Sequence, residues 1–138
     1  MKIILVFLIF FYSLQAVSFA VPSLEIGRTT FDCQENFINK GFDSCSLRVP
    51  VSIEDYSINS KYNRYSYNVR CIAAFNYWEH HPAIGFLYSG TMHETGNTII
   101  YGISFLPSYI DIKVRFISIN PVIKVAPKDI TCKVTDIY

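Results

Sequence analysis

Residues 65–78, which read YSYNVRCIAAFNYW, decide the fold. One alternating set in this segment is apolar or aromatic throughout and consists of Tyr65, Tyr67, Val69, Cys71, Ala73, Phe75 and Tyr77. The intervening set begins at Ser66, ends at Trp78 and carries the polar side chains. Alternation with a period of two, among aromatic and β-branched residues, is typical of a β-strand with one buried face. The sequence therefore predicts that this segment is the central strand of a small β-sandwich.

The same alternation recurs on both sides of this segment. We expect further strands over residues 24–31, 45–53, 83–93, 98–105, 109–119 and 130–135. Polar residues and glycine predict a loop over 32–44, a hairpin turn over 94–97 and a turn over 127–129, and Pro50 predicts a sheet edge or a bulge. About seven or eight short strands without an amphipathic helix favour an all-β sandwich of immunoglobulin or fibronectin-III type. An up-and-down barrel is the structural alternative.

Residues 1–20 have the pattern of a signal peptide. Lys2 precedes an apolar run over 3–12, and Ser18-Phe19-Ala20 forms a small-x-small cleavage site before Val21. The apolar run is shorter than a bilayer requires, so no transmembrane anchor is expected. We therefore expect a secreted or periplasmic protein whose mature part, residues 21–138, is one domain of 138 − 20 = 118 residues.

The four cysteines, Cys33, Cys45, Cys71 and Cys132, all lie in the mature part. An even number of cysteines in an exported domain predicts two disulfides. We favour Cys33–Cys45, which closes a short loop, together with Cys71–Cys132, which joins two strand interiors. The inward positions of Cys45, Cys71 and Cys132 on their strands indicate a core or inter-sheet bridge.

Composition and motifs argue against several classes of function. The chain has 12 basic and 11 acidic residues without a basic cluster, so nucleic acid is not an expected partner. It has no Gly-x-Ser-x-Gly elbow, and its cysteines are expected to be oxidised, so we predict that it is not an enzyme. Residues 79–81 (EHH) and 93–94 (HE) could approach each other, but their spacing matches no zinc motif. We therefore predict neither a metal nor a cofactor.

Aromatic residues concentrate around the central strand. Tyrosine and tryptophan provide rigid contact area at protein interfaces. Tyr65, Tyr67 and Tyr77 lie on the inward side, where core packing accounts for them. Tyr56, Tyr62 and Trp78 lie outside that set and are the predicted protein-binding residues.

With a signal that ends at residues 17–20 (VSFA) and a mature part that forms a small two-disulfide sandwich, the chain resembles the interleukin receptor mimic proteins of pathogenic Escherichia coli. The resemblance covers the whole chain and concerns size and layout. It implies a secreted, virulence-associated protein that dimerises by exchanging strands and binds host cytokines as a cytokine receptor does. The Trp-Ser-x-Trp-Ser signature of those receptors is absent, since Trp78 is the single tryptophan.

Two other protein classes share features with this chain. Residues 31–33 (FDC) and Cys132 are similar to the first and last cysteines of lipid-recognition sandwiches, which would pair Cys33 with Cys132 and carry a lipid between the sheets. A fimbrial or adhesin-type subunit completed by a donated strand is the third hypothesis. Inward Ile130, Cys132 and Val134 on the last strand favour a sandwich that is already complete. Our leading hypothesis is a secreted, non-enzymatic, protein-binding module that can form a homodimer.

Overall fold

The computed structural model describes residues 23–54, 65–101 and 107–138. The predicted signal peptide, Tyr56 and Tyr62 lie outside the described residues. The described residues form seven β-strands, which are β1 (Ser23–Ile26), β2 (Thr30–Glu35), β3 (Phe42–Glu54), β4 (Ser66–His81), β5 (Gly85–Tyr101), β6 (Ser108–Arg115) and β7 (Val122–Ile137). None of the described residues belongs to a helix long and apolar enough to span a bilayer.

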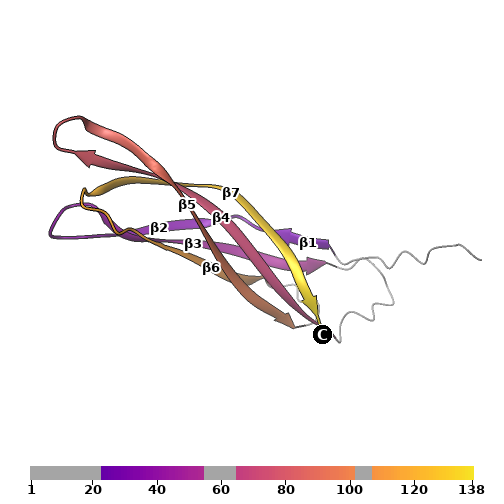
Figure 1. Ribbon diagram of the computed structural model, residues 1–138. Coiled ribbons are helices and arrows are strands. Elements are labelled where there is room, and N and C mark those ends of the chain that lie inside the picture. Colours follow the sequence, from indigo (N-terminus) through magenta and orange to yellow (C-terminus); the bar gives the residue numbers. More distant parts are fainter. Residues whose placement is uncertain (1–22, 55–64, 102–106) are drawn as a thin grey trace, which may run out of the picture.

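The strands form two antiparallel sheets that lie face to face (Figure 1). In the first sheet β3 is central, with β1 and β2 along one side and β6 along the other. In the second sheet β4 is central, between β5 and β7. The prediction of an all-β, disulfide-bonded sandwich is confirmed, and residues 65–78 do lie within the central strand of their sheet.

The core fills the space between β3 and β6 on one side and β4 on the other. Tyr67, Val69, Cys71, Ala73 and Phe75 of β4 are each 0% exposed, as their alternation predicts. They meet the equally alternating inward residues of β3 and β6, which are Leu47, Val49, Val51, Ile53, Ile110, Ile112 and Val114. Burial of large apolar side chains from both sheets supplies the main driving force for folding.

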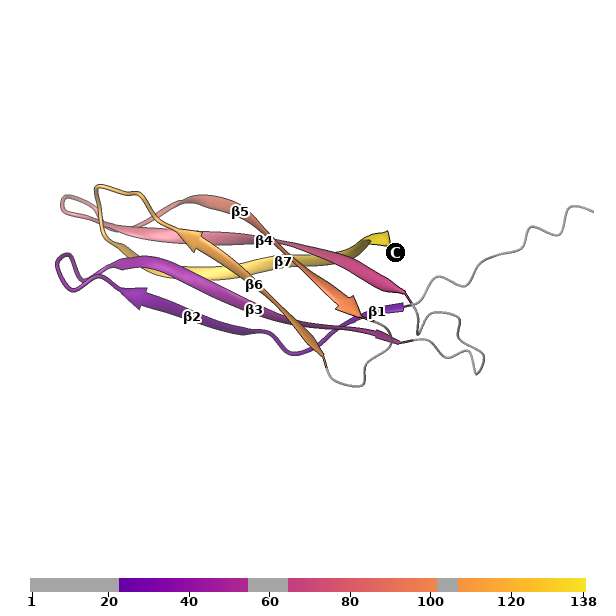
Figure 2. The same cartoon turned by 90° about the horizontal axis from the view of Figure 1, so that it is seen from below.

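The sandwich is closed on the side where β5 lies against β6 (Figure 2). Gly96 of β5 is buried there, and a Cβ atom at this position would lie 2.8 Å from Cγ2 of Ile110 and 2.9 Å from the backbone oxygen of Asp111. The predicted hairpin at 94–97 is therefore wrong, because β5 continues unbroken through it and pairs with β4 over its whole length. Glycine is present here because β5 and β6 approach each other closely, and not because the chain turns.

Three other local expectations change in the structure. The predicted loop over 32–44 begins later, because Asp32 to Glu35 extend β2 along β3. The predicted turn at 127–129 is an irregularity within β7, where Asp129 adopts a φ of 52°. Pro50 lies in the central strand β3, opposite the break between β1 and β2, and its carbonyl accepts a hydrogen bond from the Gly27 amide at 2.9 Å. A proline is tolerated in this central strand because the neighbouring strand is interrupted beside it.

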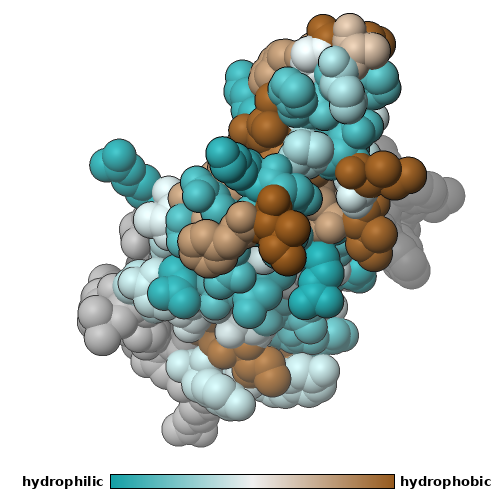
Figure 3. Space-filling model, turned by 90° about the vertical axis from the view of Figure 1, so that its left-hand side faces the viewer, coloured by the Kyte–Doolittle hydropathy of each residue, from teal (hydrophilic) through white to brown (hydrophobic). Residues whose placement is uncertain are grey.

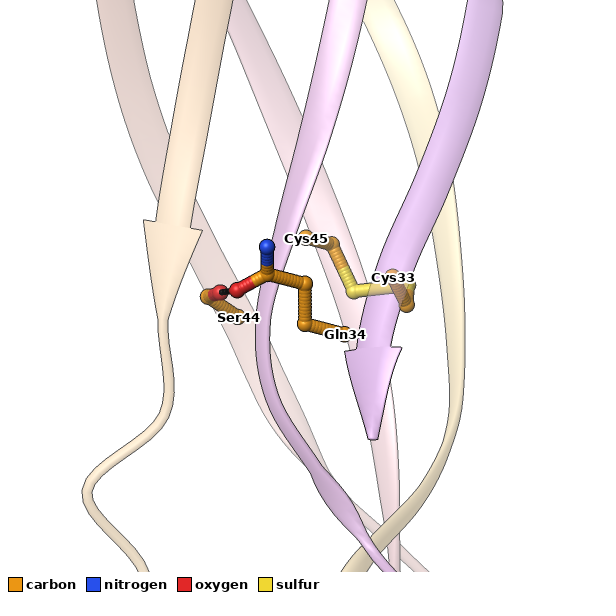
Figure 4. The surroundings of a disulfide bond; sticks show 4 residues. All are labelled: Cys33, Gln34, Ser44 and Cys45. Carbon is orange, nitrogen blue, oxygen red and sulfur yellow. Dashed lines mark hydrogen bonds between the residues drawn. A yellow bond between two sulfur atoms is a disulfide. The ribbon is translucent and has the colours of Figure 1, made fainter. Parts of the chain in front are cut away.

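Both disulfides join neighbouring strands of one sheet. Cys33 of β2 bonds to Cys45 of β3, and Cys71 of β4 bonds to Cys132 of β7. The expected pairing is therefore observed, but neither bond crosses between the sheets. Figure 4 shows the first bond, with Ser44 and Gln34 beside it joined by a hydrogen bond of 3.5 Å. Each bond attaches an edge strand to the centre of its sheet.

The first prediction concerns Gly96. Gly96→Ala should lower the free energy of unfolding by about 1–3 kcal/mol, because the new methyl group overpacks the contact with β6. Urea unfolding measures this loss. Asn97→Ala, at the exposed neighbouring position, should change stability by no more than about 0.5 kcal/mol. Equal stability of the two variants would contradict the close contact between β5 and β6.

The second prediction compares the two disulfides, which close sequence separations of 12 and 61 residues. Loop-closure entropy assigns about 3 kcal/mol to the shorter loop and about 4 kcal/mol to the longer one. The double variant C71A/C132A should therefore unfold at lower urea concentration than C33A/C45A, and both should unfold before the oxidised wild type. If C33A/C45A unfolded at the lower urea concentration instead, the attachment of β2 would depend on its disulfide more than the attachment of β7 does.

Candidate binding surface at the loop end

Three strand connections meet at one end of the sandwich. They comprise residues 36–41 between β2 and β3, 82–84 between β4 and β5, and 116–121 between β6 and β7 (Figures 1 and 2). We call these three connections the loop end. The third connection is bonded to the end of β4, just before the second: the amide of His80 donates to the carbonyl of Pro121 at 2.9 Å, and Ser118 Oγ donates to Glu79 Oε1 at 2.5 Å.

The first connection is fixed to the third by close packing. Gly41 is buried against Pro121, and a Cβ atom at Gly41 would lie 2.7 Å from Cβ of that proline. The amide of Phe116 donates to the carbonyl of Asp43 at 2.9 Å. The first and third connections therefore pack against each other, and the third is bonded to the strand end from which the second leaves.

Bulky apolar side chains stand at the tips of all three connections. Their exposed fractions are high: Phe37 95%, Ile38 94%, Ile84 67%, Ile117 97% and Ile119 102%. Figure 3, which faces this end, shows hydrophobic groups standing apart from one another among hydrophilic ones. Scattered single apolar residues on a surface are ordinary. Five of them on three adjoining loop tips make the loop end the candidate binding surface of this structure.

Polar contacts within the first connection hold its apolar tip outward. Oδ1 of Asn36 accepts a hydrogen bond from the Ile38 amide at 2.8 Å, and Nδ2 of Asn36 donates one to Asp43 Oδ1 at 2.8 Å. The amide of Lys40, whose φ is 59°, donates to the carbonyl of Asn36 at 2.9 Å. Backbone groups of the turn are satisfied internally, so Phe37 and Ile38 project from an ordered turn.

Trp78 lies behind the tips, on the outer face of the sheet formed by β5, β4 and β7. Its indole stacks on Phe86 at 6.2 Å and meets Tyr88 edge-on at 5.5 Å between ring centroids. The Lys124 ammonium lies 4.6 Å from the centroid of the indole. Phe86 and Tyr88 are 56% and 52% exposed, so this aromatic cluster extends the apolar surface of the loop end along the sheet.

The structure describes one of the three predicted binding residues, Trp78. Trp78 is partly buried within the aromatic cluster. Tyr56 and Tyr62 lie outside the described residues. Their role in binding stays a prediction.

The histidines near the β4–β5 turn act locally. His81 accepts the amide of Ala83 on Nδ1 at 3.2 Å, within the turn itself. Within the ranges that the structure describes, no three His, Cys, Asp or Glu side chains come together as a metal-binding group.

A second polar surface lies on the outer face of the other sheet. Arg48 Nε donates to Asp111 Oδ1 at 2.9 Å, and its Nη2 donates to Oδ2 at 3.3 Å. The pKa of the Asp111 carboxyl is lowered from its ordinary value, mainly by the hydrogen bond that it accepts from Arg48. Both side chains are exposed, so this ion pair contributes little to stability.

Comparison of the chain with protein-family models, with curated proteins and with solved structures gave no match. The resemblance to interleukin receptor mimic proteins therefore stays a prediction. The loop end has to be interpreted from its own chemistry.

Sequence reasoning missed the loop end because its residues belong to two different patterns. Phe37 and Ile38 lie in a segment whose polar composition predicted only a loop. Ile117 and Ile119 continue the apolar residues of the predicted strand 109–119, but β6 ends at Arg115. The usable signal was the presence of Phe-Ile inside a polar turn, where no core is available to bury them.

The third prediction concerns the aromatic cluster. Phe86→Ala should shift the emission of Trp78, the single tryptophan, to longer wavelength, because the indole loses its stacking partner and gains contact with water. The expected loss of stability is about 1 kcal/mol, as for other aromatic pairs. Ile84→Ala, in the adjoining turn, should leave the emission unchanged. Unchanged emission in Phe86→Ala would contradict the stacked geometry.

Proposed function

We propose that this protein is a secreted, non-enzymatic module that binds a protein partner through the loop end. The observation that carries the proposal is the exposure of Phe37, Ile38, Ile84, Ile117 and Ile119 on three adjoining tips. Exposed apolar residues surrounded by polar ones are characteristic of protein–protein interfaces. Their side chains lose little conformational freedom on binding if their turns are already ordered, and the internal hydrogen bonds of residues 36–43 support that condition.

The charges around the tips favour a protein over a lipid surface. Asp43 and Glu79 place carboxylates beside the apolar residues, and Lys40 and Lys124 balance them in number. An anionic membrane recruits proteins through clustered lysines and arginines, which the loop end lacks among its described residues. A protein partner with apolar pockets and a mixed-charge rim fits this surface better.

The packing between the sheets disfavours the lipid-carrier alternative. Tyr67, Phe75 and Leu47 are each 0% exposed and occupy the space in which a carrier would hold its ligand. Rings from the two sheets also meet directly, with Phe31 and Phe75 at 6.2 Å between centroids. A lipid would have to displace well-packed core side chains, which costs stability.

The fourth prediction tests the loop end. Purified wild-type protein is screened against a panel of extracellular host proteins, beginning with helical cytokines, the partner class that the receptor-like resemblance implies. The triple variant F37S/I117S/I119S should weaken binding to any partner found by at least about tenfold, as expected for exposed anchor residues. Its free energy of unfolding should change by no more than about 0.5 kcal/mol, as is typical of surface substitutions.

The matched control is I99S/Y101S, which removes two exposed apolar side chains of β5 far from the loop end. It should retain the affinity of the wild type. Vesicles of phosphatidylcholine and phosphatidylserine form the second arm of the experiment. Binding to vesicles in place of any protein, or full affinity in the triple variant, would overturn the proposal.

A further inference from the structure

The side of the sandwich opposite the contact between β5 and β6 is open. It is bordered by β1 and β2 in one sheet and by β7 in the other. Ile130, Cys132 and Val134 of β7 pack against the core but stay only partly buried. The sandwich is therefore less complete at its last strand than the sequence suggested. Within the described ranges, no strand pairs with the outer edge of β7.

The backbone of β7 presents hydrogen-bonding groups to this open side. Ser66 and Tyr138 exchange two backbone hydrogen bonds, of 3.0 and 2.9 Å, at the start of the β4–β7 ladder. The Cα atoms of Cys71 and Cys132 are 4.0 Å apart, as in a pair that does not exchange hydrogen bonds. The amide and carbonyl of Cys132 therefore point away from β4, and so do those of Ile130 and Val134 by alternation.

On this open side of the sandwich, β7 is the edge best suited to accept another strand. It has 16 residues, whereas β1 and β2 have 4 and 6 and are separated by an interruption. Short or interrupted edges resist pairing with other chains, and long regular ones invite it. Pro127, the irregularity at Asp129 and a second one at Thr135 limit the regular part of the β7 edge to residues 130–134.

We propose that two copies of this protein pair edge to edge through β7, antiparallel, with Cys132 of one copy opposite Cys132 of the other. In this register Ile130 faces Val134 of the second copy on the inner side, twice by symmetry. The two three-stranded sheets become one continuous sheet of six strands. The proposal is independent of the loop end, which lies outside this contact.

The outer face supports the same register by charge. Lys128 and Asp136 point outward, opposite Ala74 and Asn68 of β4 respectively, and both are exposed. Lys128 lies four residues to one side of Cys132 and Asp136 four residues to the other, and each lies beyond one irregularity of the ladder. The two offsets match, so with Cys132 at the two-fold axis Lys128 of one copy comes beside Asp136 of the second. Among the described residues of one chain, Lys128 has a 4.0 Å contact with the more exposed Asp129. When a strand is placed antiparallel to a copy of itself, its apolar residues should meet apolar ones and its charges should meet opposite charges. β7 meets both conditions in this register, so it is suited to pair with a second copy of itself.

The fifth prediction tests this pairing by charge exchange in the full, oxidised protein. Sedimentation velocity over a concentration series should show a monomer–dimer equilibrium for the wild type. Lys128→Glu and Asp136→Lys should each raise the dimer dissociation constant by about tenfold, because each places like charges opposite one another at both symmetric positions. The double variant K128E/D136K should restore the wild-type value. Lys113→Glu, on the outer face of β6, is the matched control and should leave it unchanged.

Hydrogen exchange in the unmodified protein provides a second measurement. The amides of Ile130, Cys132 and Val134 should exchange quickly in dilute solution and slowly at high concentration, because only the dimer protects them. The amides of Thr131 and Lys133 face β4 and should be protected at both concentrations. Three outcomes would overturn the proposal. The protein could stay monomeric at every concentration, or it could form a dimer whose dissociation constant neither charge reversal changes. Concentration-dependent protection of amides outside the β7 edge would be the third.

Discussion

The structure depends on the packing of β4 against β3 and β6. Tyr67 and Phe75 are fully buried between the sheets, and the strands around them are positioned by that packing. Because β4 pairs with a neighbour on each side, its alternation determines which faces of β5 and β7 point inward. The contact at Gly96 then brings β5 against β6 and closes one side, while the other side stays open along β7.

Alternation of side chains predicted the fold well, because one buried face imposes a strict period of two on a strand. It placed the centre of β4 and the inward residues of β6 correctly. The disulfide pairing was favoured on loop length and is observed, but neither bond crosses between the sheets. Alternation failed at Gly96 and at residues 127–129, where turn-forming residues lie inside long strands. A glycine required for close approach and one required for a turn look identical in a single sequence, since only the partner strand distinguishes them.

The candidate surface was harder to predict than the fold. Trp78 was identified, but its partners Phe86 and Lys124 come from strands whose register was not predictable from local patterns. The apolar tips were missed because solvent exposure of Phe37 or Ile119 follows from where the neighbouring strands end. Surfaces assembled from three separate connections depend on tertiary arrangement, and no local periodicity encodes them.

The separation between the loop end and the core has a consequence for how such a chain can diversify. Phe37, Ile117 and Ile119 contribute almost nothing to the buried interior, and their turns are ordered by backbone and polar contacts that do not involve these side chains. Substitutions at the tips are therefore nearly neutral for folding, while they change the shape presented to a partner. The two disulfides further shield the scaffold from such changes. The architecture thus allows the surface of the loop end to change while the frame of the sandwich remains constant.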